Sequence, residues 1–226
     1  MSNEITCRNF YHLSKSLVFL SKKWNIEIIR DMFSGKKHFK EFKKGRPDLS
    51  NKVLSNCLKN LESKGIIEKK MANSTSASTK YYLTEQGREL NRIIYELMVF
   101  SLEWSFTANK VLVFLSKKWN IELIKDMFFG KNHFKEFKEG KPDLSNKVLS
   151  ECLKNLENNG IIEKRIINPT PPSTEYYLTE LGKSLNRVLY ELAVFALENC
   201  DDNRCADEST CIRIKKEFRE TLKINY

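Results

Sequence analysis

The stretch DLSNKVLSNCLKNLESKGII, residues 48–67, has the pattern of a helix that is buried on one face and displayed on the other. Ser50 is a favoured N-cap residue, and Gly65 is a common residue at a helix end. The apolar side chains recur at helical spacing and form one stripe: Val53, Leu54, Cys57, Leu58 and Leu61. The opposite face is polar. We therefore predict a helix at 51–64 that presents short polar and cationic side chains to solvent.

The flanking segments add further elements in a definite order. We expect helices at 6–22 and 24–33, a short helix at 38–42, a turn at 45–48, the helix at 51–64, strands at 66–71 and 80–83, and a long helix at 84–104. A short helix, a tight turn, a helix with a polar outer face and a two-stranded hairpin form the layout of a winged helix-turn-helix.

The same order then occurs a second time in the chain. Residues 17–103 reappear at 112–198 without insertion or deletion, and about three quarters of the paired positions are identical. We therefore predict a mainly α fold with small β-hairpin wings (α+β), built as tandem winged helix-turn-helix domains that form a pseudo-dimer. The expected parts are a first domain at 7–104, a second at 107–199, and a cysteine-containing tail with a short helix at 200–226.

Charge favours a polyanionic partner, since the 226 residues carry a formal net charge of +10. The first repeat contains 17 Lys and Arg against 10 Asp and Glu, whereas the second contains 13 against 12. The apolar runs are short and interrupted by charge, so no membrane association is expected. Nothing resembles a secretory leader, which favours a cytoplasmic protein whose six cysteines are reduced thiols.

The polar face of the helix at 51–64 suits double-stranded DNA, because amide and hydroxyl groups can reach base edges while lysines bind phosphates. The candidates are Ser50, Asn51, Lys52, Ser55, Asn56 and Lys59, with Ser145, Asn146, Lys147, Ser150 and Lys154 in the second repeat. Glu151 replaces Asn56 there, and a carboxylate repels phosphate but accepts from cytosine. An ordinary solvated helix face is the alternative.

The wings supply a second group of cations. Lys69 and Lys70, with Lys164 and Arg165 in the second repeat, are expected on backbone phosphates, or alternatively as charges that protect a strand edge. A third basic group surrounds the first short helix: Lys36, Lys37, Lys40, Lys43, Lys44 and Arg46. The second repeat replaces Lys37 by Asn132 and Lys44 by Glu139.

Several motifs resemble the HxlR family of transcriptional regulators, in the right order and in both repeats. They are KWNIEIIRDMFSGKKHFKEF at 23–42, DLSNKVLS at 48–55, LKNLESKGII at 58–67 and YYLTEQG at 81–87. The resemblance implies MarR-like winged helices that bind DNA as homodimers through the first and last helices. This chain departs in having two fused domains, so either an internal pseudo-dimer replaces the homodimer or two chains form a four-domain assembly. His38 and His133 also stand where the family usually has Arg.

The cysteines leave several alternatives open. Cys57 and Cys152 lie on the apolar stripe and are expected to be small buried side chains. Cys7 lies near the start of the first helix, where the resemblance implies a redox-sensing cysteine in some members. Cys200, Cys205 and Cys211 cluster in the tail, where with Cys7 they form redox candidates, a zinc or iron–sulfur ligand set, or unreactive thiols. No C-x-x-C pair supports a metal.

The sequence contains no pattern of an enzyme. Its three histidines, His12, His38 and His133, accompany no nucleophile motif, and no glycine-rich phosphate loop is present. We expect a DNA-binding regulator with recognition helices at 51–64 and 146–158, in which the first repeat binds more strongly. The alternative is a winged-helix protein-interaction scaffold with only generic affinity for DNA.

Overall fold

The computed structural model describes residues 20–22, 24–71, 79–105, 107–117, 119–169, 172–199 and 208–224. The predicted fold class is confirmed, because this part of the chain is mostly helical and contains two antiparallel two-stranded hairpins. The first repeat contains α2 (Asn25–Phe33), α3 (Phe39–Lys43), α4 (Asn51–Ser63), β1 (Ile67–Met71), β2 (Thr79–Leu83), α5 (Glu85–Glu89) and α6 (Asn91–Trp104).

The second repeat follows the same order and is extended by the tail. It contains α7 (Ala108–Leu115), α8 (Asn120–Phe128), α9 (Phe134–Lys138), α10 (Asn146–Asn158), β3 (Ile162–Pro169), β4 (Pro172–Leu178), α11 (Glu180–Ser184) and α12 (Asn186–Glu198), after which comes α13 (Glu208–Thr221). The helix expected at 6–22 lies almost entirely outside the described residues, and α7 corresponds to its C-terminal part.

Each repeat has its own hydrophobic core around the recognition helix, the name used here for α4 and α10. Phe42, Leu49 and Leu54 are completely buried in the first repeat, and their counterparts Phe137, Leu144 and Leu149 are equally buried in the second. Full burial of such a side chain contributes about 1.5–3 kcal/mol. The core therefore holds the short helix, the turn and the recognition helix in one fixed arrangement.

The prediction of one continuous helix at 84–104 is wrong, because each repeat breaks it after one turn. Thr84 caps α5 by accepting the backbone N–H of Gly87 at 3.0 Å. Gly87 is packed so closely that an added Cβ would lie 2.0 Å from the carbonyl oxygen of Ile66. α5 is thus pinned to the base of the wing, and the chain changes direction at Leu90 to start α6.

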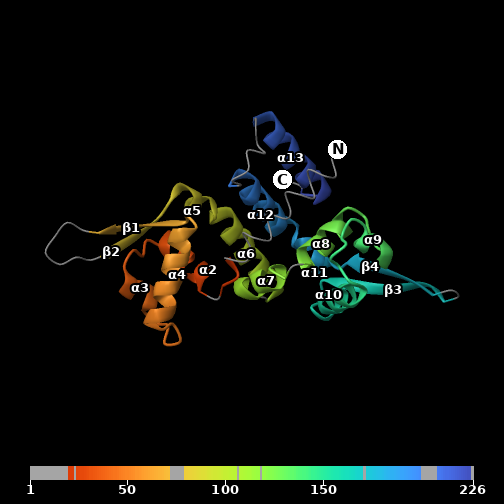
Figure 1. The fold of residues 1–226 in the computed structure, drawn as a ribbon, viewed down its shortest axis with the longest axis horizontal. Helices are drawn as coiled ribbons and strands as arrows, with labels where there is room; N and C mark the ends of the chain where they lie inside the picture. The colour runs from red at the N-terminus through yellow and green to blue at the C-terminus, as the bar shows by residue number, and fades with distance from the viewer. Residues whose placement is uncertain are drawn as a thin grey trace.

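The last helices of the two repeats, α6 and α12, meet in the centre of the molecule, and the two hairpins extend from its opposite ends (Figure 1). Ser105 ends α6 with a left-handed backbone, φ 56°, and α7 begins three residues later. The short link predicted between the repeats therefore contains a sharp turn and does not continue the helix. α6 packs against both α7 and α12, so the repeats are in direct contact.

The described strand pairing extends over more residues in the second wing than in the first. β3 and β4 pair from Ile162 with Leu178 out to Pro169 with Pro172, with an irregularity between Ile166 and Asn168. In the first repeat the described pairing ends at Met71 with Thr79.

The tail helix α13 has no counterpart in the first repeat. It lies along α12 and buries Ile214, Phe218 and Leu222. Lys215 pairs with Glu198, and the amide of Asn186 donates to the carbonyl oxygen of Leu222 at 3.1 Å. Lys215 in α13 thus contacts the end of α12, and Leu222 just after α13 contacts its start, so the two helices are antiparallel.

Candidate nucleic-acid interface

Each recognition helix is fixed by a serine cap and by a buried leucine stripe. The hydroxyl oxygens of Ser50 and Ser145 accept the backbone N–H three residues later, each at 3.2 Å. Leucines at matching positions are buried in both repeats: Leu54, Leu58 and Leu61, and Leu149, Leu153 and Leu156. These contacts hold the apolar side inward, so the polar side faces solvent.

The predicted DNA-contacting side chains of each recognition helix gather on this solvent-facing side. In the first repeat Ser50, Asn51, Lys52, Asn56 and Lys59 are exposed and Ser55 is half-buried. In the second repeat Ser145, Asn146, Lys147, Ser150 and Lys154 are all exposed, as is Glu151. Val53, which was expected in the apolar stripe, is 38% exposed. The face is thus accessible to a macromolecule along the first three turns.

A contact that sequence analysis missed joins the short helix to the start of the recognition helix. The ammonium of Lys43 donates to the side-chain oxygen of Asn51 at 2.7 Å, and Lys138 donates to Asn146 at 2.7 Å. The amide that is expected to read a base is therefore oriented by a neighbouring cation. The sequence signal was weak, since the two residues are separated by the turn.

The start of the short helix is closed by a reciprocal cap. The Glu41 carboxylate accepts the backbone N–H groups of Lys37 and His38 at 2.8 and 2.7 Å, which lowers its pKa. Glu136 does the same for Asn132 and His133. His38 and His133 are the N-cap residues, and each bridges to the wing strand through the backbone. Both histidines thus have a structural role in joining the short helix to the wing.

Part of the third basic group is used inside the protein. Arg46 pairs with Asp31 and donates to the carbonyl oxygen of Phe42 at 2.7 Å, and Lys36 pairs with Asp31 at 2.9 Å. Burial alone would raise the pKa of Asp31, but the hydrogen bonds from Arg46 and Lys36 outweigh it and lower the pKa. Arg46 therefore anchors the turn before α4 to α2, and Lys36 anchors the segment before α3, whereas Lys37, Lys40 and Lys44 stay exposed.

The wing cations differ in how strongly the protein already engages them. Lys70 pairs with Glu68 at 2.8 Å and lies over the ring of Tyr82, as does Lys37. Arg165 likewise pairs with Glu163 and lies over the ring of Tyr177. Lys69 and Lys164 are the exposed residues one position earlier in each strand. The aromatic ring at each wing base thus gathers positive charge on one side of the hairpin.

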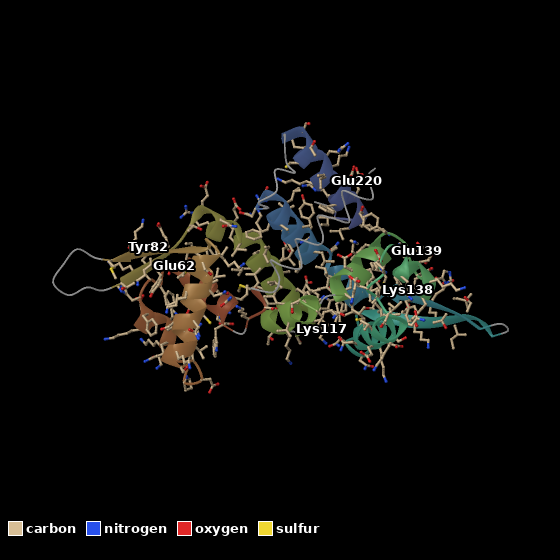
Figure 2. The ribbon with its side chains drawn as sticks, viewed as in Figure 1. Glu62, Tyr82, Lys117, Lys138, Glu139 and Glu220 are labelled. Carbon is tan, nitrogen blue, oxygen red and sulfur yellow. The ribbon has the colours of Figure 1, made fainter. Side chains whose placement is uncertain are left out.

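Acidic replacements make the same surface of the second repeat less basic. Glu139 replaces Lys44 and lies next to Lys138 at the end of α9 (Figure 2). Glu175 replaces Lys80, accepts the hydroxyl of Tyr177, and has a carboxylate oxygen 3.5 Å from His133 Nε2. Together with Glu151, these carboxylates lie on the short helix, the wing and the recognition helix. The charge difference between the repeats is therefore concentrated on the face expected to meet DNA.

The packing of α6 on α12 is reciprocal. Arg92 of α6 attracts Glu191 of α12, and their repeat counterparts, Arg187 and Glu96, attract each other in the same way. Burial raises the pKa of both carboxyls, and the facing arginine opposes that shift in each case. Such exchange of equivalent residues is the signature of a two-fold interface. The contact between α6 and α12 therefore involves equivalent residues of the two repeats.

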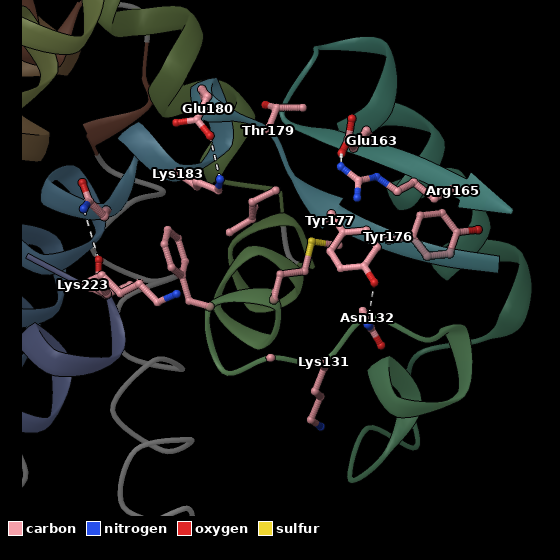
Figure 3. Close-up of a pocket in the computed structure, with 16 residues that line it drawn as sticks. Lys131, Asn132, Glu163, Arg165, Tyr176, Tyr177, Thr179, Glu180, Lys183 and Lys223 are labelled. Carbon is pink, nitrogen blue, oxygen red and sulfur yellow. Dashed lines mark hydrogen bonds and ion pairs between the residues drawn. The ribbon is translucent and has the colours of Figure 1, made fainter. Parts of the chain in front are cut away.

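The tail also forms one wall of a hollow of about 750 Å³ beside the second wing (Figure 3). Tyr176 and Tyr177 line it from the wing, and Leu222 and Lys223 close it from the end of α13. Charges along the wall are paired locally, since Lys183 contacts Glu180 at 2.6 Å and Arg165 contacts Glu163. Among the residues that the structure describes, the first repeat has no counterpart of α13 to form such a wall.

The structure separates the cysteines into two groups. Cys57 and Cys152 are half-buried free thiols whose pKa values are raised by burial, with Lys22 and Lys117 opposing the shift. Cys211 is disulfide-bonded, so the expectation of reduced thiols throughout is wrong for this residue. Cys7, Cys200 and Cys205 lie outside the described residues. Within the described ranges, no cluster of His, Cys, Asp and Glu has the arrangement of a metal site.

Helices in the described part of the chain are too short or too polar to span a bilayer.

The family description that matches is "HxlR-like helix-turn-helix", and it matches twice, at residues 19–108 and 114–204. Among curated relatives, the HTH-type transcriptional regulator YodB of Bacillus subtilis is 38% identical over 96 residues, which are 42% of this chain and 86% of YodB. The uncharacterised regulator YvaP of the same organism is 38% identical over 92 residues, 41% of this chain and 85% of YvaP.

Solved structures include the reduced form of YodB from B. subtilis, 36% identical over 42% of this chain and 92% of that chain, with a TM-score of 0.38. The structure of diamide-treated YodB from B. subtilis is 36% identical over 42% of this chain and 93% of that chain, with a TM-score of 0.36. The relatives are transcriptional regulators, and the protein is not an enzyme. Because the two matches to the family description together cover most of its length, the chain belongs to the HxlR-like helix-turn-helix family and carries the family's domain twice.

Proposed function

We propose that the protein is a cytoplasmic transcriptional regulator that binds double-stranded DNA as an internal pseudo-dimer. Its units are the domains at 7–104 and 107–199, with the tail at 200–226 attached to the second. The recognition helices enter successive major grooves, and the wings contact the flanking phosphates. Membership in a family of helix-turn-helix regulators supports the general function, and the arrangement of the two repeats supports the finer one.

The observation that carries this proposal is the reciprocal packing of α6 on α12. A two-fold-symmetric operator needs two recognition helices related by the same symmetry. The contact of α6 with α12, in which each arginine attracts a glutamate of the other helix, supports such a relation within one chain. A second contact between the repeats, from the Asn199 amide to Glu89 at 2.8 Å, supports the same arrangement.

Within each repeat we assign two kinds of contact. Lysines of the recognition helix and cations of the wing bind phosphates, and amide and hydroxyl groups read bases. The phosphate contacts are Lys52, Lys59, Lys69, Lys70, Lys147, Lys154, Lys164 and Arg165; the base or sugar contacts are Ser50, Asn51, Ser55, Asn56, Ser145, Asn146 and Ser150. The exposure of these side chains on one face supports the assignment.

The two half-sites are proposed to be unequal. Glu139, Glu151 and Glu175 lower the positive charge of the second repeat on the face expected to meet DNA. A carboxylate near phosphates weakens binding, but Glu151 can accept a hydrogen bond from cytosine. The operator is therefore an imperfect palindrome in which the first repeat binds the stronger half.

Thiol chemistry in the tail is proposed to modulate binding. Cys211 is disulfide-bonded and belongs to α13, which packs on α12, one of the two helices that set the spacing of the recognition helices. Reduction would release a covalent constraint on α13. Cys7, Cys200 and Cys205 are the remaining redox candidates.

The test is fluorescence anisotropy of the full chain with duplex DNA from its own upstream region and with a random duplex, at two salt concentrations, with and without reductant. Specific binding that weakens steeply with salt is the expected result, and a change on reduction would support the thiol assignment. Equal and weak binding to both duplexes would instead support the protein-interaction scaffold, which the acidic residues of the second repeat favour.

A further inference from the structure

The second wing carries two consecutive isoleucines that are left in solvent. Ile166 and Ile167 are 68% and 48% exposed. Single apolar residues on a protein surface are ordinary, but these two follow each other on a hairpin that projects away from the rest of the molecule (Figure 1). The pair is therefore a candidate contact surface.

An irregularity of the strand pairing occurs at the same place. Ile166 pairs with Thr174 and Asn168 pairs with Ser173, so β3 contains one more residue than β4 at this point, and Ile167 is the extra one. A bulge of this kind interrupts the alternation of side chains along a strand and redirects the extra side chain. The two isoleucines are thus released from the regular pattern of the hairpin.

The corresponding segment of the first repeat has a different character. Met71 stands at the position of Ile166 and is also 68% exposed, but Ala72 stands at the position of Ile167. The second repeat also has three prolines between 169 and 172, where the first repeat has serine and alanine. Each proline fixes φ, so less conformational freedom is lost when this segment is ordered on a partner.

The neighbours of the isoleucine pair favour DNA as that partner. Lys164 and Arg165 directly precede the pair on β3 and are exposed, and the proposed function places both on the sugar–phosphate backbone. A strand advances about 3.3 Å per residue, so the isoleucines follow within about 10 Å of these cations. A groove that is edged by phosphates and floored by bases complements an apolar pair that is edged by cations.

We propose that Ile166 and Ile167 form a wedge that enters the minor groove beside the second half-site and partly unstacks one base step. This inference rests on the proposed function, because it requires the second wing to lie on DNA. Two strands about 4.8 Å apart, together with their side chains, are wider than a minor groove of about 6 Å. The wing therefore enters where the groove is opened, and an apolar side chain inserted between base pairs opens it by kinking the duplex.

The wedge gives the second repeat a way of selecting DNA that does not depend on its charge. Glu139, Glu151 and Glu175 make this repeat less basic than the first. Unstacking is easiest at flexible pyrimidine–purine steps such as TA and CA, so the wing selects sequence through the deformability of the duplex. Isoleucine suits this role because its branched side chain is stiff and loses little freedom on insertion.

Permanganate footprinting of the full chain on the duplex from its own upstream region tests the wedge, since permanganate oxidises thymines that are unstacked. Wild type should make a thymine of a pyrimidine–purine step reactive on one side of the binding site. Ile166→Val/Ile167→Val should keep most of this reactivity. Ile166→Thr/Ile167→Thr should lose it, because threonine has the shape of valine with a hydroxyl in place of one methyl.

Two controls accompany these variants. Met71→Thr changes the equally exposed residue of the first wing and should leave the pattern of reactive thymines unchanged. Replacing the reactive step by GC should lower the affinity of wild type about tenfold, and that of Ile166→Thr/Ile167→Thr much less. Thermal unfolding of each variant confirms that it is folded.

Anisotropy on the same samples separates this inference from the proposed function. Specific binding without a reactive thymine would overturn the wedge and leave the DNA-binding regulator in place. Reactivity that persists in Ile166→Thr/Ile167→Thr would do the same, and the isoleucine pair would then be a surface for a protein partner. Equal, weak binding to this duplex and to a random one would overturn both proposals.

Discussion

Removing the two lysines from each recognition helix should separate the contributions of the two repeats. Lys52→Ala/Lys59→Ala and Lys147→Ala/Lys154→Ala delete equivalent exposed cations. The surroundings of the two pairs differ at one position of the helix. Glu151 lies four residues after Lys147 and three before Lys154, so it neighbours both on the helix surface, whereas the first repeat has the neutral Asn56. We therefore expect Glu151 to offset part of the positive charge of both lysines.

Counterion release sets the size of the expected effect. Each lysine bound to a phosphate contributes about 0.9 to the slope of log affinity against log salt concentration. Losing two lysines in the first repeat lowers this slope by about 1.8. The ratio of wild-type to variant affinity for DNA should therefore fall about twelvefold between 50 and 200 mM salt. For the two lysines of the second repeat we expect the slope to fall by about 0.9 or less. The ratio of wild-type to variant affinity should then change about fourfold or less over the same salt range.

The assay is anisotropy with one operator duplex at several salt concentrations. Glu151→Asn gives the matched control, because in that background the second pair of lysines should behave like the first. Equal slope losses for the two double variants in the wild-type background would refute the neutralisation argument. The argument would also be refuted if Glu151→Asn did not increase the slope loss that Lys147→Ala/Lys154→Ala causes.

Three further changes test the fold that carries the site. Thr84→Ala should lower the free energy of unfolding by about 1 kcal/mol, as a urea midpoint would record, because α5 loses its cap; an unchanged midpoint would contradict this role. Gly87→Ala should cost about 2 kcal/mol or more, since the methyl group meets the Ile66 carbonyl; a wild-type melting temperature would show that the wing base can yield. Glu191→Gln should raise stability at pH 7.5. Its pKa is raised by burial, so the folded state binds a proton more readily, and wild type gains stability as the pH falls towards the unfolded value of about 4.5. The advantage of the variant should therefore fade on acidification, and a constant difference across pH would contradict the assignment.

Local features of the chain were predictable because they depend on neighbouring residues. The serine caps, the leucine stripe and the stopping glycine lie within one segment, and the observed α4 ends within one residue of the predicted boundary. The hairpins were located by the same kind of signal. The break at Leu90 was not predictable in this way, because it depends on the approach of Gly87 to a residue 21 positions earlier.

Features that depend on distant partners were missed for the same reason. The pairing of Lys43 with Asn51 requires the turn between them to be folded. The use of Arg46 and Lys36 as internal anchors depends on the buried carboxylate of Asp31 on another helix. The cover of α13 on α12 could not be inferred from the repeat, since the tail occurs once. The base-reading roles of the recognition helices stay predictions.

The short turn at Ser105 joins two halves that are no longer identical. A homodimer places two equal subunits on its operator, so it reads the same in either orientation. A fused chain has one preferred orientation, because only one half carries Glu139, Glu151 and Glu175. Subunits of related regulators cannot exchange into a covalent pair, and dilution cannot separate it. Under the proposed mode of binding, direction along the DNA therefore becomes a property that this chain can encode and a symmetric homodimer cannot.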